Sequence, residues 1–157
     1  ITHKQSHPMA IVDRAISMQN EYDELWCVFD KDDFIDFDDA IRKAANYQKI
    51  NCAFSNEAIE YWFILHFSNR RGAISRKKLN DTISQEFNIE YNKSEEIIER
   101  VCERLFDLDI QKAEERAKLG YEYHMSNSGN KYSDWSSCTS AFMLTKRLRK
   151  WDEANRR

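Results

Sequence analysis

Six aspartates lie within ten consecutive residues, 30–39, and three of them directly follow an apolar stretch at residues 25–29. That stretch is rich in aromatic and β-branched residues, which is typical of a strand buried on both faces in a parallel sheet. Ligands of open parallel sheets bind beyond the carboxyl ends of the strands. Crowded carboxylates repel each other, and a hard divalent cation relieves that repulsion. We therefore predict that Asp30, Asp32 and Asp33 bind Mg²⁺ or Mn²⁺.

The other three aspartates have a simpler interpretation, as caps and dipole-stabilising charges at the start of the next helix. These are Asp36, Asp38 and Asp39. Two familiar acidic motifs fit this segment poorly. An EF-hand loop would need Gly and Glu where the chain has Ile35 and Ile41. The D-x-D motif of haloacid-dehalogenase-type phosphatases would need a small β-branched residue where the chain has Phe34.

A third acid, Glu60, lies in a segment whose apolar residues surround almost the whole circumference of a helix over residues 58–67. Such a helix is buried. A buried carboxylate without a partner costs several kcal/mol, so Glu60 should be paired, bound to metal or raised in pKa. Its helix directly follows a second apolar stretch at residues 50–54. We therefore expect Glu60 to join Asp30 and Asp32 in a catalytic, metal-binding constellation for phosphoryl-transfer chemistry.

Basic residues gather in the last twelve positions, 146–157, where six Lys and Arg oppose two acids. With Trp151 among them, we predict that Arg147 and Lys150 contact a phosphate backbone. The alternative is a solvated face of an amphipathic helix. Lys93 is likewise expected to approach phosphate, or to lie at the start of the next helix without such a role.

The hydrophobic periodicity sets the elements that must position these residues. Strands are expected at residues 25–29 and 50–54, and helices at residues 8–19, 36–49, 58–67, 75–87, 94–108, 110–119 and 138–155. Gly120 is expected to end the sixth helix, and residues 124–137 are polar and loop-like. Helices alternating with strands predict an α/β core with a short, mostly parallel sheet, followed by a helical C-terminal half.

Composition excludes several classes of protein. The 157 residues include 24 Lys and Arg against 27 Asp and Glu, so the net charge of −3 disfavours an indiscriminate polycation. Three Gly and one Pro are too few for a glycine-rich phosphate loop. No apolar run approaches the roughly 20 residues that span a bilayer, and no signal peptide is visible, so we predict a cytoplasmic protein without membrane contact.

Cysteine and histidine have structural interpretations here. The four cysteines are widely spaced and are expected to be small buried residues in a reducing compartment. His3, His7 and His66 show no spacing for zinc. His66 is expected to be a core histidine bonded to a backbone carbonyl, with a role at the site as the alternative.

Two segments together resemble the RloB-like family of bacterial restriction-modification and retron-type defence loci. They are residues 26–34, WCVFDKDDF, and residues 55–67, SNEAIEYWFILHF. Tyr91-x-Lys93 and the Cys138-Thr139 pair also resemble downstream motifs of the family. The chain differs where the family usually has Pro-Cys-Phe, at residues 57–59, and where Pro-Ser-Thr is common, at residues 137–139.

The resemblance implies a Toprim-like three-layer fold, similar to that of topoisomerases and primases, with Asp30 and Asp32 as its D-x-D metal pair. It implies one domain over residues 1–157, with an α/β part at 1–72 and a helical part at 73–157. Because the chain begins at Ile1, we expect the first strand and its glutamate motif to lie upstream.

The leading functional hypothesis is an anti-phage defence protein with a Toprim-like Mg²⁺ site, acting as a metal-dependent nuclease on DNA or RNA. Its expected partners are nucleic acid and a co-encoded defence protein such as an ATPase. The alternative is a non-catalytic interaction or sensor module of a defence complex, in which the acids cap helices or bind a regulatory metal.

Overall fold

Two parallel strands and a short third strand form the sheet. In the computed structural model, which describes residues 7–156, β1 (Leu25–Asp30) pairs in parallel with β2 (Ile50–Asn56). β3 (Cys138–Thr139) pairs antiparallel to β2, giving the order β1-β2-β3. The α/β class is confirmed, and the sheet is mixed, because β1 and β2 are parallel while β3 runs antiparallel to β2. Ile1 and His3 lie outside the described residues.

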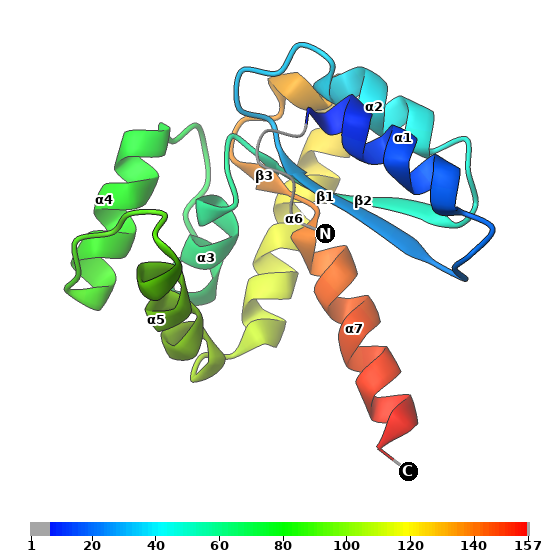
Figure 1. Ribbon diagram of the computed structural model, residues 1–157. Coiled ribbons are helices and arrows are strands. Elements are labelled where there is room, and N and C mark those ends of the chain that lie inside the picture. Colours follow the sequence, from blue (N-terminus) through cyan, green and yellow to red (C-terminus); the bar gives the residue numbers. More distant parts are fainter. Residues whose placement is uncertain (1–6, 157) are drawn as a thin grey trace.

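Helices cover the sheet unevenly. α1 (Pro8–Met18) and α2 (Phe37–Ala44) lie together on one side of the sheet and bury Cys27 and Phe29 of β1 (Figure 1). Val28, which alternates with these two residues, is 50% exposed. The prediction that this strand is buried on both faces is therefore wrong, because α1 and α2 shield only one face of β1.

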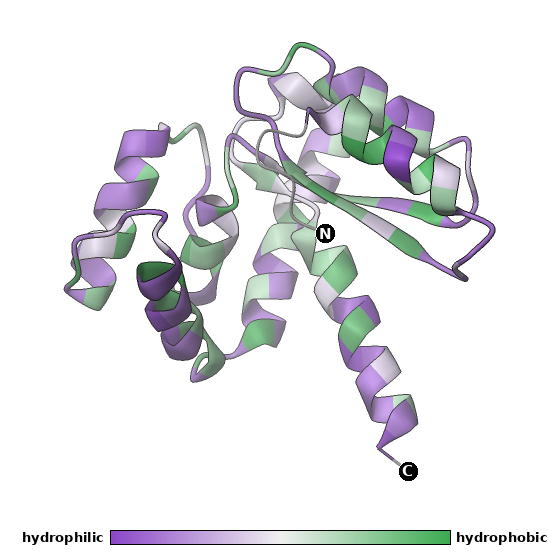
Figure 2. Ribbon diagram, in the orientation of Figure 1, coloured by the Kyte–Doolittle hydropathy of each residue, from purple (hydrophilic) through white to green (hydrophobic). Residues whose placement is uncertain are grey.

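The remaining helices share a second apolar cluster, and the last two of them also pack against β3 and β2 of the sheet (Figure 1). They are α3 (Glu60–Phe67), α4 (Arg76–Phe87), α5 (Glu95–Phe106), α6 (Ile110–Asn127) and α7 (Ala141–Asn155). Figure 2 shows the strands coloured mostly as hydrophobic, while the visible turns of α4 and α5 are largely hydrophilic. None of the helices in residues 7–156 is both long and apolar enough to cross a bilayer.

Three predicted boundaries are wrong. α2 ends at Ala44 and not at residue 49, because the chain turns there, with the Tyr47 amide donating to the Ala44 carbonyl at 2.9 Å, and then enters β2. α6 continues through Gly120 to Asn127, because Gly120 keeps helical backbone angles and Tyr121 packs into both apolar clusters. Residues 138–139 form β3 instead of the start of the last helix, because they pair with Ser55 and Asn56 of β2. The predicted loop before them also contains a single 3-10 turn, η1 (Tyr132–Asp134).

Candidate functional site

Asp30 and Glu60 leave the sheet at the same edge. Asp30 is the last residue of β1 and lies opposite Ser55 of β2. Glu60 opens α3, which begins four residues after β2 ends. The parallel pairing of β1 and β2 thus carries both carboxylates to the carboxyl ends of the strands, where ligands of parallel sheets bind.

Glu60 is completely buried, with 0% of its surface exposed. Its Oε1 accepts a hydrogen bond from the Tyr91 hydroxyl at 2.8 Å and lies 3.1 Å from the Lys93 ammonium. Both partners come from the segment between α4 and α5. The other oxygen, Oε2, is buried without a hydrogen-bond partner among the described residues. The helical position of Glu60 predicts its burial, but its partners come from a loop whose path the sequence does not reveal.

Asp30 is a much weaker acid than an exposed aspartate. Its pKa is raised to about 7, mainly by burial; the charges of Glu60 and Asp32 also raise it, while Lys93 and a hydrogen bond with the Ile59 backbone act in the opposite direction. Desolvation disfavours the carboxylate form, so near neutral pH this group is divided between its protonated and ionised forms. Asp30 therefore lies within electrostatic reach of the two other predicted catalytic acids.

Asp32 pairs with a basic residue, and Asp33 lies in solvent. Asp32 adopts a left-handed backbone with φ of 40°, which aspartate tolerates better than most residues, and its carboxylate pairs with Arg76 of α4. Asp33 is exposed and lines a separate shallow cavity of about 530 Å³ that also includes Asp38. Within residues 7–156, no three or more His, Cys, Asp or Glu side chains are grouped closely enough to hold a metal ion.

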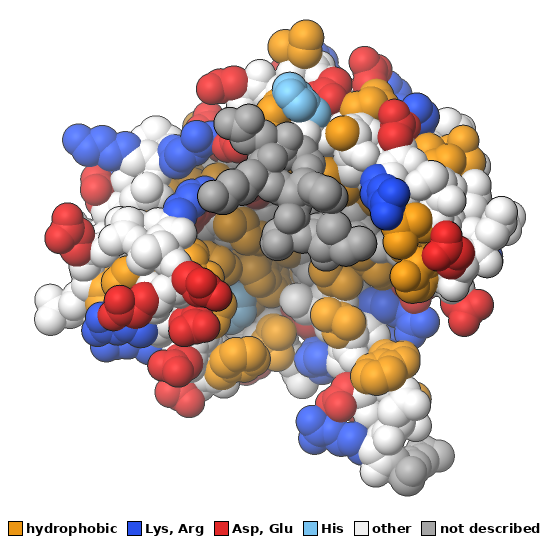
Figure 3. Space-filling model, viewed as in Figure 1, with side chains coloured by type: hydrophobic (Ala, Val, Ile, Leu, Met, Phe, Trp, Pro, Cys, Tyr) orange, Lys and Arg blue, Asp and Glu red, His pale blue; other side chains and the backbone are white. Residues whose placement is uncertain are grey.

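The predicted nucleic-acid contacts divide between two places. Lys93 lies in the acid cluster, bound to Glu60. Arg147 pairs with Glu24 at 2.6 Å, just before β1 begins and therefore at the opposite end of that strand from Asp30. Lys150 is exposed on α7. Figure 3, viewed as Figure 1, shows positive and negative side chains interspersed on the visible face of the molecule, without one continuous basic patch.

Three further polar residues, one histidine and two aspartates, make contacts within the folded chain. His66 Nδ1 lies 3.0 Å from the Trp62 carbonyl oxygen, as expected for a core histidine, and burial lowers its pKa. Asp38 accepts hydrogen bonds from Ser133, at 2.8 Å from the amide and 2.6 Å from the hydroxyl. Asp39 pairs with Arg42 within α2. These contacts are structural.

Arg76 is the site neighbour that sequence reasoning missed. It stands in a run of three basic residues at the start of α4, a pattern typical of a solvated helix end. Its pairing with Asp32 depends on the turn after β1, where the Asp32 amide donates to the Glu57 carbonyl at 3.3 Å. No local signal in the sequence reports that contact.

The comparisons with known proteins agree with the family suggested by the motifs. A family model described as RloB-like protein matches residues 1–148. No curated protein matches the chain, and no solved structure does either. The Toprim likeness therefore has no structural neighbour behind it. The family match covers most of the chain, including both acidic segments, and the chain belongs to the RloB-like protein family.

Proposed function

We propose that this member of the RloB-like family is a restriction-modification-associated defence protein that cleaves nucleic acid with a divalent cation held at Asp30 and Glu60. The observation that carries the proposal is the Oε2 atom of Glu60, a carboxylate oxygen buried without a partner beside a second carboxylate. A buried carboxylate oxygen without a partner is costly, and a bound cation would relieve that cost.

The local charge favours a cation. Asp32 is matched by Arg76, which leaves Asp30 and Glu60 to share the single positive charge of Lys93. If both carboxylates ionise, one negative charge remains uncompensated among these three residues. Mg²⁺ typically takes one or two protein carboxylates and completes its coordination with water and substrate phosphates. Two carboxylates with a free oxygen therefore suit Mg²⁺ or Mn²⁺.

The same residues suit phosphodiester hydrolysis. A bound divalent cation supplies charge neutralisation at the phosphate and a more acidic water. Tyr91 would hold Glu60 in place through its 2.8 Å hydrogen bond. The Lys93 side chain is 54% exposed, so its ammonium can contact an incoming phosphate while it remains next to the carboxylates.

One observation favours the second candidate, a non-catalytic interaction or sensor module. Arg76 and Lys93 already pair with Asp32 and Glu60, so these two acids have protein partners without any metal. On this reading the ion pairs fasten α4 and the segment after it to the sheet edge.

Metal binding is the first test. Titration calorimetry with MgCl₂ and MnCl₂ should show binding to the native chain that is lost in Asp30→Asn and in Glu60→Gln. Asp39→Asn is the matched control, because its exposed carboxylate pairs with Arg42 away from the cluster. Equal affinity in all four proteins would exclude the assigned site.

Cleavage is the second test. Plasmid, single-stranded DNA and RNA are incubated with the protein and either cation. We expect cleavage of at least one substrate by the native chain and by Asp39→Asn, and none by Asp30→Asn or Glu60→Gln. Absence of metal binding and of cleavage, with a stable complex with a co-encoded protein, would instead establish the module.

A further inference from the structure

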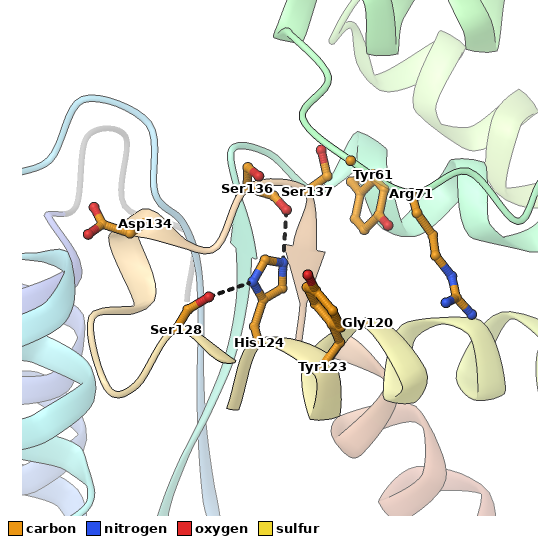
Figure 4. A pocket seen from close by; sticks show the side chains of 10 residues that line it. Tyr61, Arg71, Gly120, Tyr123, His124, Ser128, Asp134, Ser136 and Ser137 are labelled. Carbon is orange, nitrogen blue, oxygen red and sulfur yellow. Dashed lines mark hydrogen bonds between the residues drawn. The ribbon is translucent and has the colours of Figure 1, made fainter. Parts of the chain in front are cut away.

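A cavity of about 490 Å³ lies apart from the acid cluster, between the start of α3, the C-terminal half of α6 and the segment before β3 (Figure 4). None of the three predicted catalytic acids lines it. Its volume is within the range of roughly 300–1,000 Å³ that small-molecule sites occupy. Residues that matter for its chemistry are Tyr61, Arg71, Gly120, Tyr123, His124 and Ser136.

The wall of the cavity is fixed by its own hydrogen bonds. His124 Nε2 lies 3.1 Å from the Ser136 carbonyl oxygen, and its ring stacks on Trp135 with an interplanar angle of 11°. Tyr61 donates its hydroxyl to the Arg70 carbonyl at 3.0 Å. Tyr123, in contrast, is 61% exposed and presents an aromatic ring at the cavity without an assigned partner for its hydroxyl among the described residues.

The charge available to a ligand is positive. Arg71 is exposed, forms no ion pair within the described part of the chain, and lies close enough to Tyr61 to lower the pKa of that hydroxyl against the larger effect of burial. Asp134 also lines the cavity, but Lys131 neutralises it at 2.8 Å. An anionic ligand with a flat aromatic part therefore suits the lining.

Gly120 gives a second, independent sign that the cavity is a site. Glycine inside a helix costs about 0.5–1 kcal/mol relative to alanine. Yet Gly120 lies within α6, has no positive φ, and a Cβ built there would meet no atom within 4 Å. Neither backbone geometry nor packing requires glycine here, and the space that it leaves open belongs to the cavity.

We propose that this cavity binds one unpaired nucleotide, with its base against Tyr123 and its phosphate at Arg71. Bases stack on aromatic side chains irrespective of sequence, and arginine recognises phosphate through several donors. The nucleotide is either a free mononucleotide or one residue of a single strand. This inference does not depend on the metal site, so its test is carried out in EDTA, where failure of the nuclease proposal has no effect.

The experiment measures binding of two probes to the 157-residue chain: thymidine 5′-monophosphate by calorimetry, and fluorescein-labelled dT10 by anisotropy. Tyr123→Ala should weaken binding about ten-fold, the loss typical of one stacked base. Arg71→Gln should reduce the slope of log affinity against log salt by about 0.7 for dT10, as one phosphate contact is lost. Gly120→Leu should abolish binding by filling the cavity. Ser126→Leu, on an exposed position of α6, is the matched control.

Binding of the monophosphate supports a free nucleotide as the ligand, whereas binding of dT10 alone supports a strand. Circular dichroism verifies that each variant is folded, and Asp39→Asn, which lies outside both sites, should bind as the native chain does. The inference is overturned if neither probe binds, if Gly120→Leu binds as well as Ser126→Leu, or if a ten-base-pair duplex competes as well as dT10.

Discussion

Lys93 places its ammonium 3.1 Å from Glu60 while 54% of its side chain remains in solvent, and Glu60 itself is wholly buried. The negative charge of the buried Glu60 carboxylate is therefore balanced by a cation at the protein surface. Because Lys93 also influences Asp30, both carboxylates depend on one flexible side chain. At the scale of single residues, the acid cluster is held in place by two contacts to Glu60, from Lys93 and Tyr91.

The raised pKa of Asp30 predicts a pH-dependent stability. Between about pH 4 and pH 7 the folded chain retains a proton at Asp30 that the unfolded chain has lost, so this group lowers stability as pH rises through that window. Asp30→Asn cannot ionise. We expect it to exceed the native chain in stability by about 4 kcal/mol at pH 8 and to equal it near pH 4, because each pKa unit corresponds to about 1.4 kcal/mol.

Urea unfolding in EDTA at both pH values checks this expectation, with Asp39→Asn as the exposed control. A gain of the same size at both pH values would show that Asp30 is not the titrating group.

Tyr91→Phe should destabilise the protein by about 1–3 kcal/mol, because it removes a hydrogen bond to a buried, charged acceptor and leaves Glu60 less satisfied. The matched control is Tyr22→Phe, whose ring is 47% exposed and which should change stability by less than about 0.5 kcal/mol. Chemical denaturation measures both. Equal effects of the two variants would mean that the Tyr91 hydroxyl contributes nothing to holding Glu60.

At the scale of elements, α7 is anchored to α6 by one buried acid. Glu114 is 1% exposed, and its Oε2 accepts a hydrogen bond from Arg149 at 2.6 Å. Thr145, one turn earlier on α7, donates to Oε1 at 2.9 Å. Other side chains of this part of α7 are exposed, with Leu148 and Trp151 each more than half accessible. The position of α7 thus depends on a polar contact as well as on apolar packing.

Arg149→Met should destabilise the protein by about 2–3 kcal/mol, since it leaves the Glu114 charge buried with only Thr145; the 35% exposure of Arg149 keeps the loss below that of a fully buried pair. Arg156 directly follows α7 and forms a solvent-exposed pair with Asp152, so Arg156→Met should cost less than about 1 kcal/mol. Thermal unfolding compares the stability of the two variants, and hydrogen exchange across α7 should accelerate only in Arg149→Met.

The elements that could be predicted from the sequence are those with a local cause. Apolar runs at residues 25–29 and 50–54 form β1 and β2, and the helical position of Glu60 predicts its burial. β3 was missed because two residues form a strand only through pairing with Ser55 and Asn56, more than 80 positions away. The partners of the acids were missed for the same reason: side chains from distant segments meet only in the folded chain.

At the scale of the whole molecule, two apolar clusters meet at α6. One lies between the sheet, α1 and α2, and the other among α3 to α7. Tyr121 packs against both, with ring contacts to Phe54 of β2, to Trp135 and to Phe142 of α7. A residue shared in this way couples the two clusters, so we expect them to unfold together.

Val12→Ala tests this coupling, because Val12 is fully buried in the sheet cluster and its truncation should cost about 2 kcal/mol. If the chain unfolds as one unit, hydrogen exchange should accelerate equally in β2 and in α5, although α5 belongs to the other cluster. Acceleration confined to the sheet cluster would show that the two parts unfold independently.

The late closure of the sheet has a consequence for synthesis of the protein. β2 can pair with β1 early, but its other edge is covered only after residues 138–140 have been made, where Thr139 binds Ser55 and the Ser140 hydroxyl accepts from the Phe54 amide. At roughly 5–20 residues per second, the ribosome needs about 4–17 s to add the intervening residues. During that interval the nascent chain exposes an unpaired apolar strand edge, which is the kind of surface that chaperones shield.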